Sequence, residues 1–228
     1  MRLDREAADV TVPDKSLNPF YLDKPRPDIL AMIPADGTII GSIGCNTGAT
    51  EAVLVKEGRT VWGVDVNSEA IEVASQRLQR AWVIDASDPL PFPEDSLDGL
   101  ILADVLEHMP QAWTRLRDLA RCVHVGGWVV ISVPNMRSLR VAWFFGVRGD
   151  WPEHPEGVFD STHIQVMSAR RLERWCEGAN LTIDRRYPHW DGRNPASNLF
   201  IRVLNVGTLG LLRSWLMLEL QVRCRRVA

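Results

Sequence analysis

Residues 38–48 read Thr-Ile-Ile-Gly-Ser-Ile-Gly-Cys-Asn-Thr-Gly, and this stretch decides the fold class. Its β-branched first half predicts a buried strand over 38–43. Gly44 and Gly48 frame the turn that follows, and residues 49–57 have helical character with Gly58 as a fitting C-cap. Glycines at a strand-to-helix turn let a ligand approach the backbone closely, although a tight turn without a ligand is the alternative.

The alternation of strands and helices continues along the chain. It predicts strands over 60–65, 81–85, 97–103, 128–133, 181–187 and 217–226, and helices over 28–33, 69–80, 111–122 and 168–178, with Ser68 and Ser168 as N-caps. Gly126-Gly127 predicts a turn, and the proline-rich residues 89–93 exclude regular structure. Strands that alternate with helices imply a mainly parallel sheet with helices on both faces. Such a sheet binds its ligand beyond the carboxyl ends of its strands.

Composition excludes several classes of protein. At 228 residues, with 46% hydrophobic and 24% charged residues, the chain suits one folded domain, and its net charge of −3 gives no basic field for nucleic acid. The four cysteines lack zinc-site spacing, and together with an N-terminus without an apolar signal core they favour reduced thiols in the cytoplasm. Residues 199–220 are apolar but interrupted by Arg202, Asn205 and Arg213, so no transmembrane segment is predicted.

Acidic residues follow three consecutive predicted strands. Asp65 ends the second strand about 20 residues after Gly44, where a carboxylate suits the two hydroxyls of a ribose. The alternative is an acid favoured by the N-terminus of the next helix. Asp85 suits an adenine amino group, and Asp104 follows the fourth strand. Carboxylates gathered at one edge of a sheet are costly unless a ligand, a cation or water separates them, so we predict a ligand site there.

Four segments (40–48, 63–71, 84–106 and 125–135), in this order and spacing, resemble a class I S-adenosylmethionine-dependent methyltransferase of the small-molecule type. The resemblance implies a Rossmann-like, doubly wound α/β fold with a seven-stranded, mostly parallel sheet in the order 3-2-1-4-5-7-6. It implies S-adenosylmethionine as the cofactor, held by the following residues: Gly44, Cys45, Asn46, Gly48, Asp65, Val66, Asp85, Ala86, Asp104, Val105, Tyr21 and Arg26.

The chain departs from the family pattern at two positions of the glycine turn. Ser42 stands where the family usually has an acid that helps to hold the methionine part of the cofactor, and Asn46 stands where it has a third glycine. A lost charge-assisted hydrogen bond costs about 1.5–3 kcal/mol, so either the cofactor binds more weakly or another acid compensates. Asn46 is the milder change, because asparagine tolerates a left-handed backbone.

We expect a single methyltransferase domain with four parts: an N-terminal arm over 1–35, a cofactor-binding core over 36–135, an acceptor-site insertion over 136–167, and a closing helix, lid segment and last strands over 168–228. The arm is expected to close over the cofactor, with Arg26 pairing with the cofactor carboxylate; a surface arginine is the alternative. The apolar segment 203–218 covers the pocket, pairs two subunits or rests on a membrane surface, and packing inward is the favoured reading.

A hydroxyl acceptor needs a base, and histidine is the natural choice. His108 follows the fourth strand beside the expected cofactor, with a structural hydrogen bond as the alternative role. His163 lies in the insertion, and Asp160 is placed to orient its ring or to act as the base itself. These three are the predicted catalytic residues. Asp104, Glu107 and Asp160 are oxygen ligands that suit magnesium, but no motif demands a metal and none is predicted.

The sequence therefore predicts methyl transfer to a hydroxyl of a small molecule or sugar, such as a bacterial glycan or a secondary metabolite. The expected partner is that small-molecule or carbohydrate acceptor, and the chain is expected to be a monomer or a homodimer. One rival is a protein of the same fold that binds the cofactor without methylating. The other is a nicotinamide-dependent oxidoreductase, which the absence of a G-x-G-x-x-G fingerprint disfavours.

Overall fold

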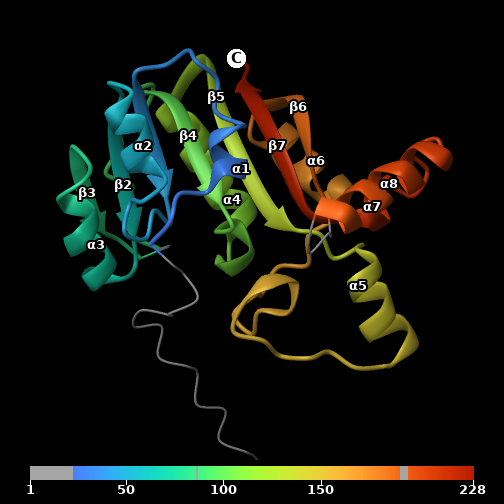
Figure 1. The fold of residues 1–228 in the computed structure, drawn as a ribbon. Helices are drawn as coiled ribbons and strands as arrows, with labels where there is room; N and C mark the ends of the chain where they lie inside the picture. The colour runs from blue at the N-terminus through green and yellow to red at the C-terminus, as the bar shows by residue number, and fades with distance from the viewer. Residues whose placement is uncertain (1–22, 86, 191–194) are drawn as a thin grey trace, which may run out of the picture.

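The structure is a computed structural model that describes residues 23–85, 87–190 and 195–228. These residues form a seven-stranded sheet in the order β3-β2-β1-β4-β5-β7-β6 (Figure 1). The strands β1 to β5 run parallel, and β7 is antiparallel to both of its neighbours. The strands are β1 (Ile39–Ile43), β2 (Thr60–Asp65), β3 (Arg80–Val83), β4 (Leu97–Ala103), β5 (Val123–Pro134), β6 (Leu181–Trp190) and β7 (Met217–Arg226). The predicted fold class and strand order are confirmed.

Helices cover both faces of the sheet. On one face α1 (Pro27–Leu30), α2 (Glu51–Lys56) and α3 (Ser68–Ser75) bury Ile29, Leu54 and Ile71 in one apolar cluster with the sheet. On the other face α4 (Ala112–Cys122) and α6 (Ala169–Gly178) bury Leu116 and Leu172 in a second cluster. Because the central strands are covered on both sides, β4 reads as an almost continuous apolar run.

Most predicted boundaries hold to within two residues, but the region around α3 differs. The N-cap is Asn67 and not Ser68: the Asn67 side chain accepts hydrogen bonds from the backbone N–H groups of Glu69 and Ala70. The helix ends at Ser75, well before the predicted end at residue 80, because Arg80 already belongs to β3. Ser168 caps α6 as predicted, through a bond from the Arg171 N–H.

The predicted turn at Gly126-Gly127 does not separate two elements, because both glycines lie inside the long strand β5, where Gly126 has a left-handed φ of 88°. The pairing of β5 with β4 is irregular there, since its register shifts between Leu97 and Gly99 of β4. The shift brings the fully buried Trp128 over Gly99, where an added Cβ atom would lie 2.1 Å from the indole ring. The long β5 therefore depends on a glycine in its neighbour.

Two helical segments extend beyond the sheet. The insertion after β5 contains α5 (Leu139–Val141) and the helical turns η2 (Ala142–Val147) and η3 (Gly157–Phe159), while α7 (Pro195–Gly207) and α8 (Arg213–Leu216) join β6 to β7. Figure 1 shows α5, α7 and α8 at the end of the sheet where β5 finishes. The α7–α8 segment exposes several apolar side chains: Leu199, Val203, Val206, Leu209 and Leu211. No helix in the described part of the chain combines the length and apolarity that a membrane crossing needs.

Candidate active site

The glycine turn after β1 has a backbone that most side chains would strain. Gly44, Asn46 and Gly48 all have positive φ angles, of 69°, 49° and 72°. The N–H groups of Gly44 and Cys45 donate to the Val64 carbonyl of β2 at 2.8 and 3.1 Å, so the turn is held against the neighbouring strand. Asn46 adopts the left-handed conformation that its side chain was expected to tolerate.

Asp65 at the end of β2 binds this turn directly. Its Oδ2 accepts from the Asn46 N–H at 2.8 Å, and its Oδ1 accepts from the Asn67 N–H at 3.0 Å. A carboxylate has about four acceptor positions, so each oxygen keeps one for a further donor. The half-buried Asp65 therefore keeps acceptor positions for further hydrogen bonds, and the neighbouring Val66 is 60% exposed.

The segment after β3 lies beside the end of β2, since the Ile84 N–H donates to the Asp65 carbonyl at 2.9 Å. Asp85 follows and is exposed, and its Oδ1 accepts from the N–H and the hydroxyl of Ser87 at 3.2 Å. Three strand-end acids thus share one edge of the sheet, as predicted. Two predicted cofactor residues, Tyr21 and Ala86, lie outside the described residues.

The serine that replaces the family acid has a buried acid as its partner. The Ser42 hydroxyl donates to Oε1 of Glu51 at 2.7 Å, and the two side chains are 1% and 4% exposed. Burial raises the pKa of the Glu51 carboxyl to about 6, and the hydrogen bond from Ser42 partly offsets this rise. An acid is therefore present next to the position where the family pattern has one.

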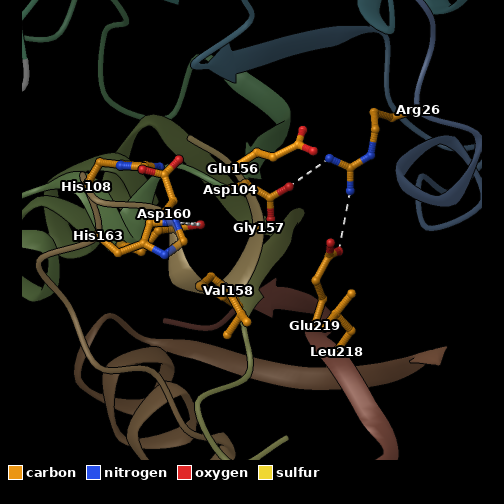
Figure 2. Close-up of a pocket in the computed structure, with 12 residues that line it drawn as sticks. Arg26, Asp104, His108, Glu156, Gly157, Val158, Asp160, His163, Leu218 and Glu219 are labelled. Atoms are coloured by element: carbon orange, nitrogen blue, oxygen red, sulfur yellow. Dashed lines mark hydrogen bonds and ion pairs between the residues drawn. The ribbon is translucent and has the colours of Figure 1, made fainter. Parts of the chain in front are cut away.

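Asp104 follows β4 in a left-handed conformation, with φ 53°. Its two oxygens accept from Ser132 Oγ and from Nη1 of Arg26, each at 2.7 Å. Arg26 also pairs with Asp28 at 2.7 Å. A further ion pair joins Arg26 to Glu219 of β7 at 3.4 Å, and Figure 2 shows it beside the pair with Asp104. Burial opposes the charge of Arg26, but the hydrogen bond to Asp28 and the charges of Asp104 and Glu219 outweigh it and raise its pKa. Arg26, predicted to bind the cofactor carboxylate, thus pairs with carboxylates of the protein itself.

The side chain of Val105, the residue after Asp104, packs against the glycine turn. A Cβ atom added to Gly44 would lie 2.7 Å from Cγ2 of Val105. The close approach requires glycine at position 44 independently of its φ angle. It also ties the segment after β4 to the predicted cofactor turn, so the two parts of the site form one continuous edge.

All three predicted catalytic residues line one cavity of about 220 Å³ (Figure 2). Thr162 Oγ1 donates to Oδ1 of Asp160 at 2.6 Å and lies 2.9 Å from Nδ1 of His108. Because the hydroxyl has given its only proton to Asp160, Nδ1 of His108 must donate, which makes Nε2 the acceptor nitrogen of the neutral ring. The rings of His108 and His163 lie 4.8 Å apart between centroids. Thr162 is not among the residues predicted from the sequence, since no motif links it to a histidine 54 residues earlier.

Glu107 is the most buried acid of this cavity. The residue is fully buried, and Nε2 of His163 lies 3.8 Å from its Oε1. Burial, together with the nearby charge of Asp104, raises the pKa of the Glu107 carboxyl well above its usual range. The remaining lining is also polar, with Asp104, Glu156 and Glu219 alongside the apolar Pro134, Val158 and Leu218.

Two features define the class I methyltransferase architecture. They are the sheet order with an antiparallel β7, and a glycine turn at the same edge of the sheet as the acids that follow β2, β3 and β4. A family model described as a methyltransferase domain matches residues 21–185. The chain belongs to this family of S-adenosylmethionine-dependent methyltransferases. The predictions of the family and of its cofactor are confirmed.

Individual relatives are distant. Demethylmenaquinone methyltransferase from Tropheryma whipplei (strain Twist) is 28% identical over 99 residues, which cover 42% of this chain and 41% of the relative. Ubiquinone biosynthesis O-methyltransferase from Alkalilimnicola ehrlichii is 25% identical over 182 residues, which cover 75% and 70%. The chain thus spans less than half of the first relative. A solved methyltransferase from Archaeoglobus fulgidus matches with a TM-score of 0.60 at 20% identity, over 83% of this chain and 86% of that one.

Proposed function

We propose that this protein transfers the methyl group of S-adenosylmethionine to a hydroxyl of a small, polar acceptor such as a sugar. The observation that carries the proposal is the cavity beside Asp104, in which His108, His163 and Asp160 meet next to the cofactor edge of the sheet. The bound sulfonium supplies a methyl carbon that is already electrophilic. The work left to the protein is to position the acceptor and to remove its proton.

The cofactor-binding residues are assigned by their place at the strand ends. We assign the ribose hydroxyls to Asp65, whose oxygens each keep one acceptor position, and the adenine to the segment around Asp85. The left-handed turn from Gly44 to Gly48 brings the backbone close to the cofactor.

Glu51 takes over the role of the missing family acid in this proposal. Its carboxyl lies within a hydrogen bond of Ser42, the position at which the family pattern has its own acid. A cationic ammonium nearby would favour the ionised form of Glu51. The single substitution Ser42→Asp would put a second carboxyl against the buried carboxyl of Glu51. The informative variant is Ser42→Asp combined with Glu51→Gln, which keeps a single acid.

We assign removal of the acceptor's proton to the pair His108 and His163. Asp160 supports His108 through Thr162. The hydrogen bonds from His108 through Thr162 to Asp160 hold the imidazole in the form whose Nε2 accepts a proton. Acidic and imidazole side chains dominate the lining, and a hydroxyl-rich acceptor satisfies such groups better than an apolar ring does. The volume of about 220 Å³ fits the reacting end of a small molecule.

Two measurements test the proposal. Calorimetry should show tighter binding of S-adenosylhomocysteine than of a nicotinamide dinucleotide, and the reverse order would end the proposal. Methyl transfer should then be followed with labelled cofactor against a panel of sugars, phenols and hydroxyquinones. Cofactor binding without transfer to any acceptor would favour the rival in which the fold binds the cofactor for structure or regulation.

A second candidate acceptor is a quinone-type ring, favoured by the names of the two curated relatives. The exposed apolar side chains of α7 and α8 add support, because a lipid-soluble acceptor is reached at an apolar surface. The same panel separates the candidates: transfer to hydroxyquinones in preference to sugars would replace the first proposal with the second.

A further inference from the structure

The carboxylate of Glu107 is buried without a hydrogen-bond donor. Both of its oxygens are shielded from solvent, and neither has a hydrogen-bond partner among the described residues. The nearest ion-pair partner, Nε2 of His163, is 3.8 Å away, which is too long for a hydrogen bond. Buried carboxylates are normally paired, hydrogen-bonded or bound to a cation. Glu107 lines the acceptor cavity, so a cation could reach it from that side.

Two imidazole rings stand beside this carboxylate. One ligand atom from each of Glu107, His108 and His163 can be chosen so that all three lie within 4.8 Å of one another. The side chains come from η1 (Leu106–His108), at the end of β4, and from the insertion 55 residues later along the chain. Two imidazoles and one carboxylate form the three-ligand set that several divalent transition metals use in proteins.

The backbone around the three side chains is fixed. The Glu107 carbonyl accepts hydrogen bonds from the N–H groups of both Ile164 and Gln165, at 2.9 and 3.1 Å. These hydrogen bonds hold the insertion next to Glu107, and His163, the residue before Ile164, is therefore held beside Glu107. A metal-bound histidine usually donates its other ring N–H to a neighbouring acceptor. His108 does so here: its Nδ1 donates to Thr162, and Thr162 donates to Asp160.

We propose that Glu107, His108 and His163 bind a divalent first-row transition metal, of the Zn²⁺ or Mn²⁺ type, in the wall of the acceptor cavity. An oxygen of the acceptor would complete the coordination, so the cation would orient the hydroxyl that becomes methylated. In that state both imidazoles would serve as metal ligands and not as bases. The metal would acidify the bound hydroxyl, and the proton would leave to water. Binding of the metal itself does not depend on which acceptor the protein uses.

The proposal departs from the sequence-based prediction of no metal, and it also selects a different ligand set. The oxygen ligands that the sequence offers for a metal are Asp104, Glu107 and Asp160. In the structure Asp104 is taken by Arg26 and Ser132, and Asp160 is taken by Thr162. Imidazole nitrogen suits transition metals, whereas Mg²⁺ prefers oxygen ligands. We therefore expect Zn²⁺ and Mn²⁺ to bind more tightly than Mg²⁺.

A second group nearby provides a control. Ligand atoms of Asp28, His189 and Glu219 also lie within 4.8 Å of one another. Their acids already have donors, because the Gln221 amide donates to Asp28 at 2.8 Å and to Glu219 at 3.0 Å. His189→Ala therefore removes a histidine from a cluster of similar composition without touching the proposed site.

The test is metal binding by the full chain, freed of metal with a chelator. Calorimetric titration with ZnCl₂ and MnCl₂ should show one equivalent bound. Glu107→Gln and His163→Ala should each weaken that binding at least 10-fold, while His189→Ala should leave it within 2-fold. Excess Zn²⁺ should raise the melting temperature of the wild type and of His189→Ala, but not of Glu107→Gln. Circular dichroism checks that each variant is folded.

Co²⁺ bound to the wild type gives a second readout that does not depend on variants folding. Its visible absorption should show nitrogen ligation. No binding to the wild type would overturn the proposal, as would binding that survives both Glu107→Gln and His163→Ala or is lost only in His189→Ala. Titration with S-adenosylhomocysteine in the same samples reports the cofactor site separately, so failure of the metal site and failure of the proposed function can be told apart.

Discussion

Glu51 gives a prediction in which the sign and the size both follow from burial. The Glu51 carboxyl is 4% exposed and accepts one hydrogen bond, from Ser42. Burial raises its pKa from the ordinary 4.5 to about 6. A rise of about 1.5 pKa units corresponds to about 2 kcal/mol of differential interaction between the protonated and ionised forms.

The sign follows from linkage. In the unfolded chain the carboxyl ionises near pH 4.5, whereas in the folded protein it keeps its proton up to about pH 6. The folded state therefore binds one more proton than the unfolded chain between these pH values. The stabilisation that this proton gives the folded state is fully present below pH 4.5 and is lost as the pH rises through 6. Glu51→Gln removes the titration while its amide oxygen can still accept from Ser42. Relative to the wild type, the variant should gain about 2 kcal/mol between pH 4.5 and 7.5.

The assay is urea unfolding of both proteins at pH 4.5, 6 and 7.5, with the difference in free energy of unfolding taken at each pH so that other titrating groups cancel. Glu57→Gln, which removes an exposed carboxylate just after the same helix and 3.9 Å from Arg59, is the control for loss of a carboxylate that is not desolvated. A difference between wild type and Glu51→Gln that stays constant across this range would refute the reasoning, because it would mean that the Glu51 carboxylate is not desolvated.

Three further predictions concern the cofactor, the acceptor and the sheet. Asp65→Ala should weaken binding of S-adenosylhomocysteine at least 10-fold in calorimetry, because each charge-assisted hydrogen bond to the ribose is worth about 1.5–3 kcal/mol; unchanged affinity would remove Asp65 from the site. Thr162→Val should lower kcat about 10-fold or more with cofactor affinity intact, since it breaks the link from Asp160 to His108, and equal turnover would show the link to be structural. Gly99→Ala should lower the free energy of unfolding by about 1–3 kcal/mol or prevent folding, because its Cβ would lie 2.1 Å from the buried indole ring. A Cβ on Gly146 meets nothing within 4 Å, so the control Gly146→Ala should unfold at nearly the wild-type urea concentration.

Local patterns were sufficient to predict the sheet and to place the strand-end acids at one edge of it. The strands over 60–65, 97–103 and 217–226 coincide with β2, β4 and β7, because each is a distinct apolar or alternating run. The acids at positions 65 and 104 could be placed at one edge because parallel strands share their carboxyl ends. The N-cap error was local, because Asn67 and Ser68 are both good N-caps and the structure uses Asn67.

Contacts between distant residues could not be predicted in the same way. Arg26 meets Glu219 across 193 positions, and His108 meets Thr162 across 54. No spacing rule links such pairs. They come together only once the whole sheet has formed and the insertion is hydrogen-bonded to Glu107. The burial of Glu107 is of the same kind: the sequence shows an acid with metal-ligand chemistry, and only the packed structure shows that its oxygens lack donors.

The position of β7 has a consequence for synthesis. When residues 1–216 have left the ribosome, all the parallel strands and the edge strand β6 have been synthesised. The strand β7, which lies between β5 and β6 in the sheet, has not. Until then the buried edge of β5 has an unfilled row of backbone groups, and Arg26 lacks its partner Glu219. The nascent chain is therefore exposed to mispairing until the ten-residue strand β7 emerges, and a premature stop before residue 217 would leave a fragment prone to aggregate.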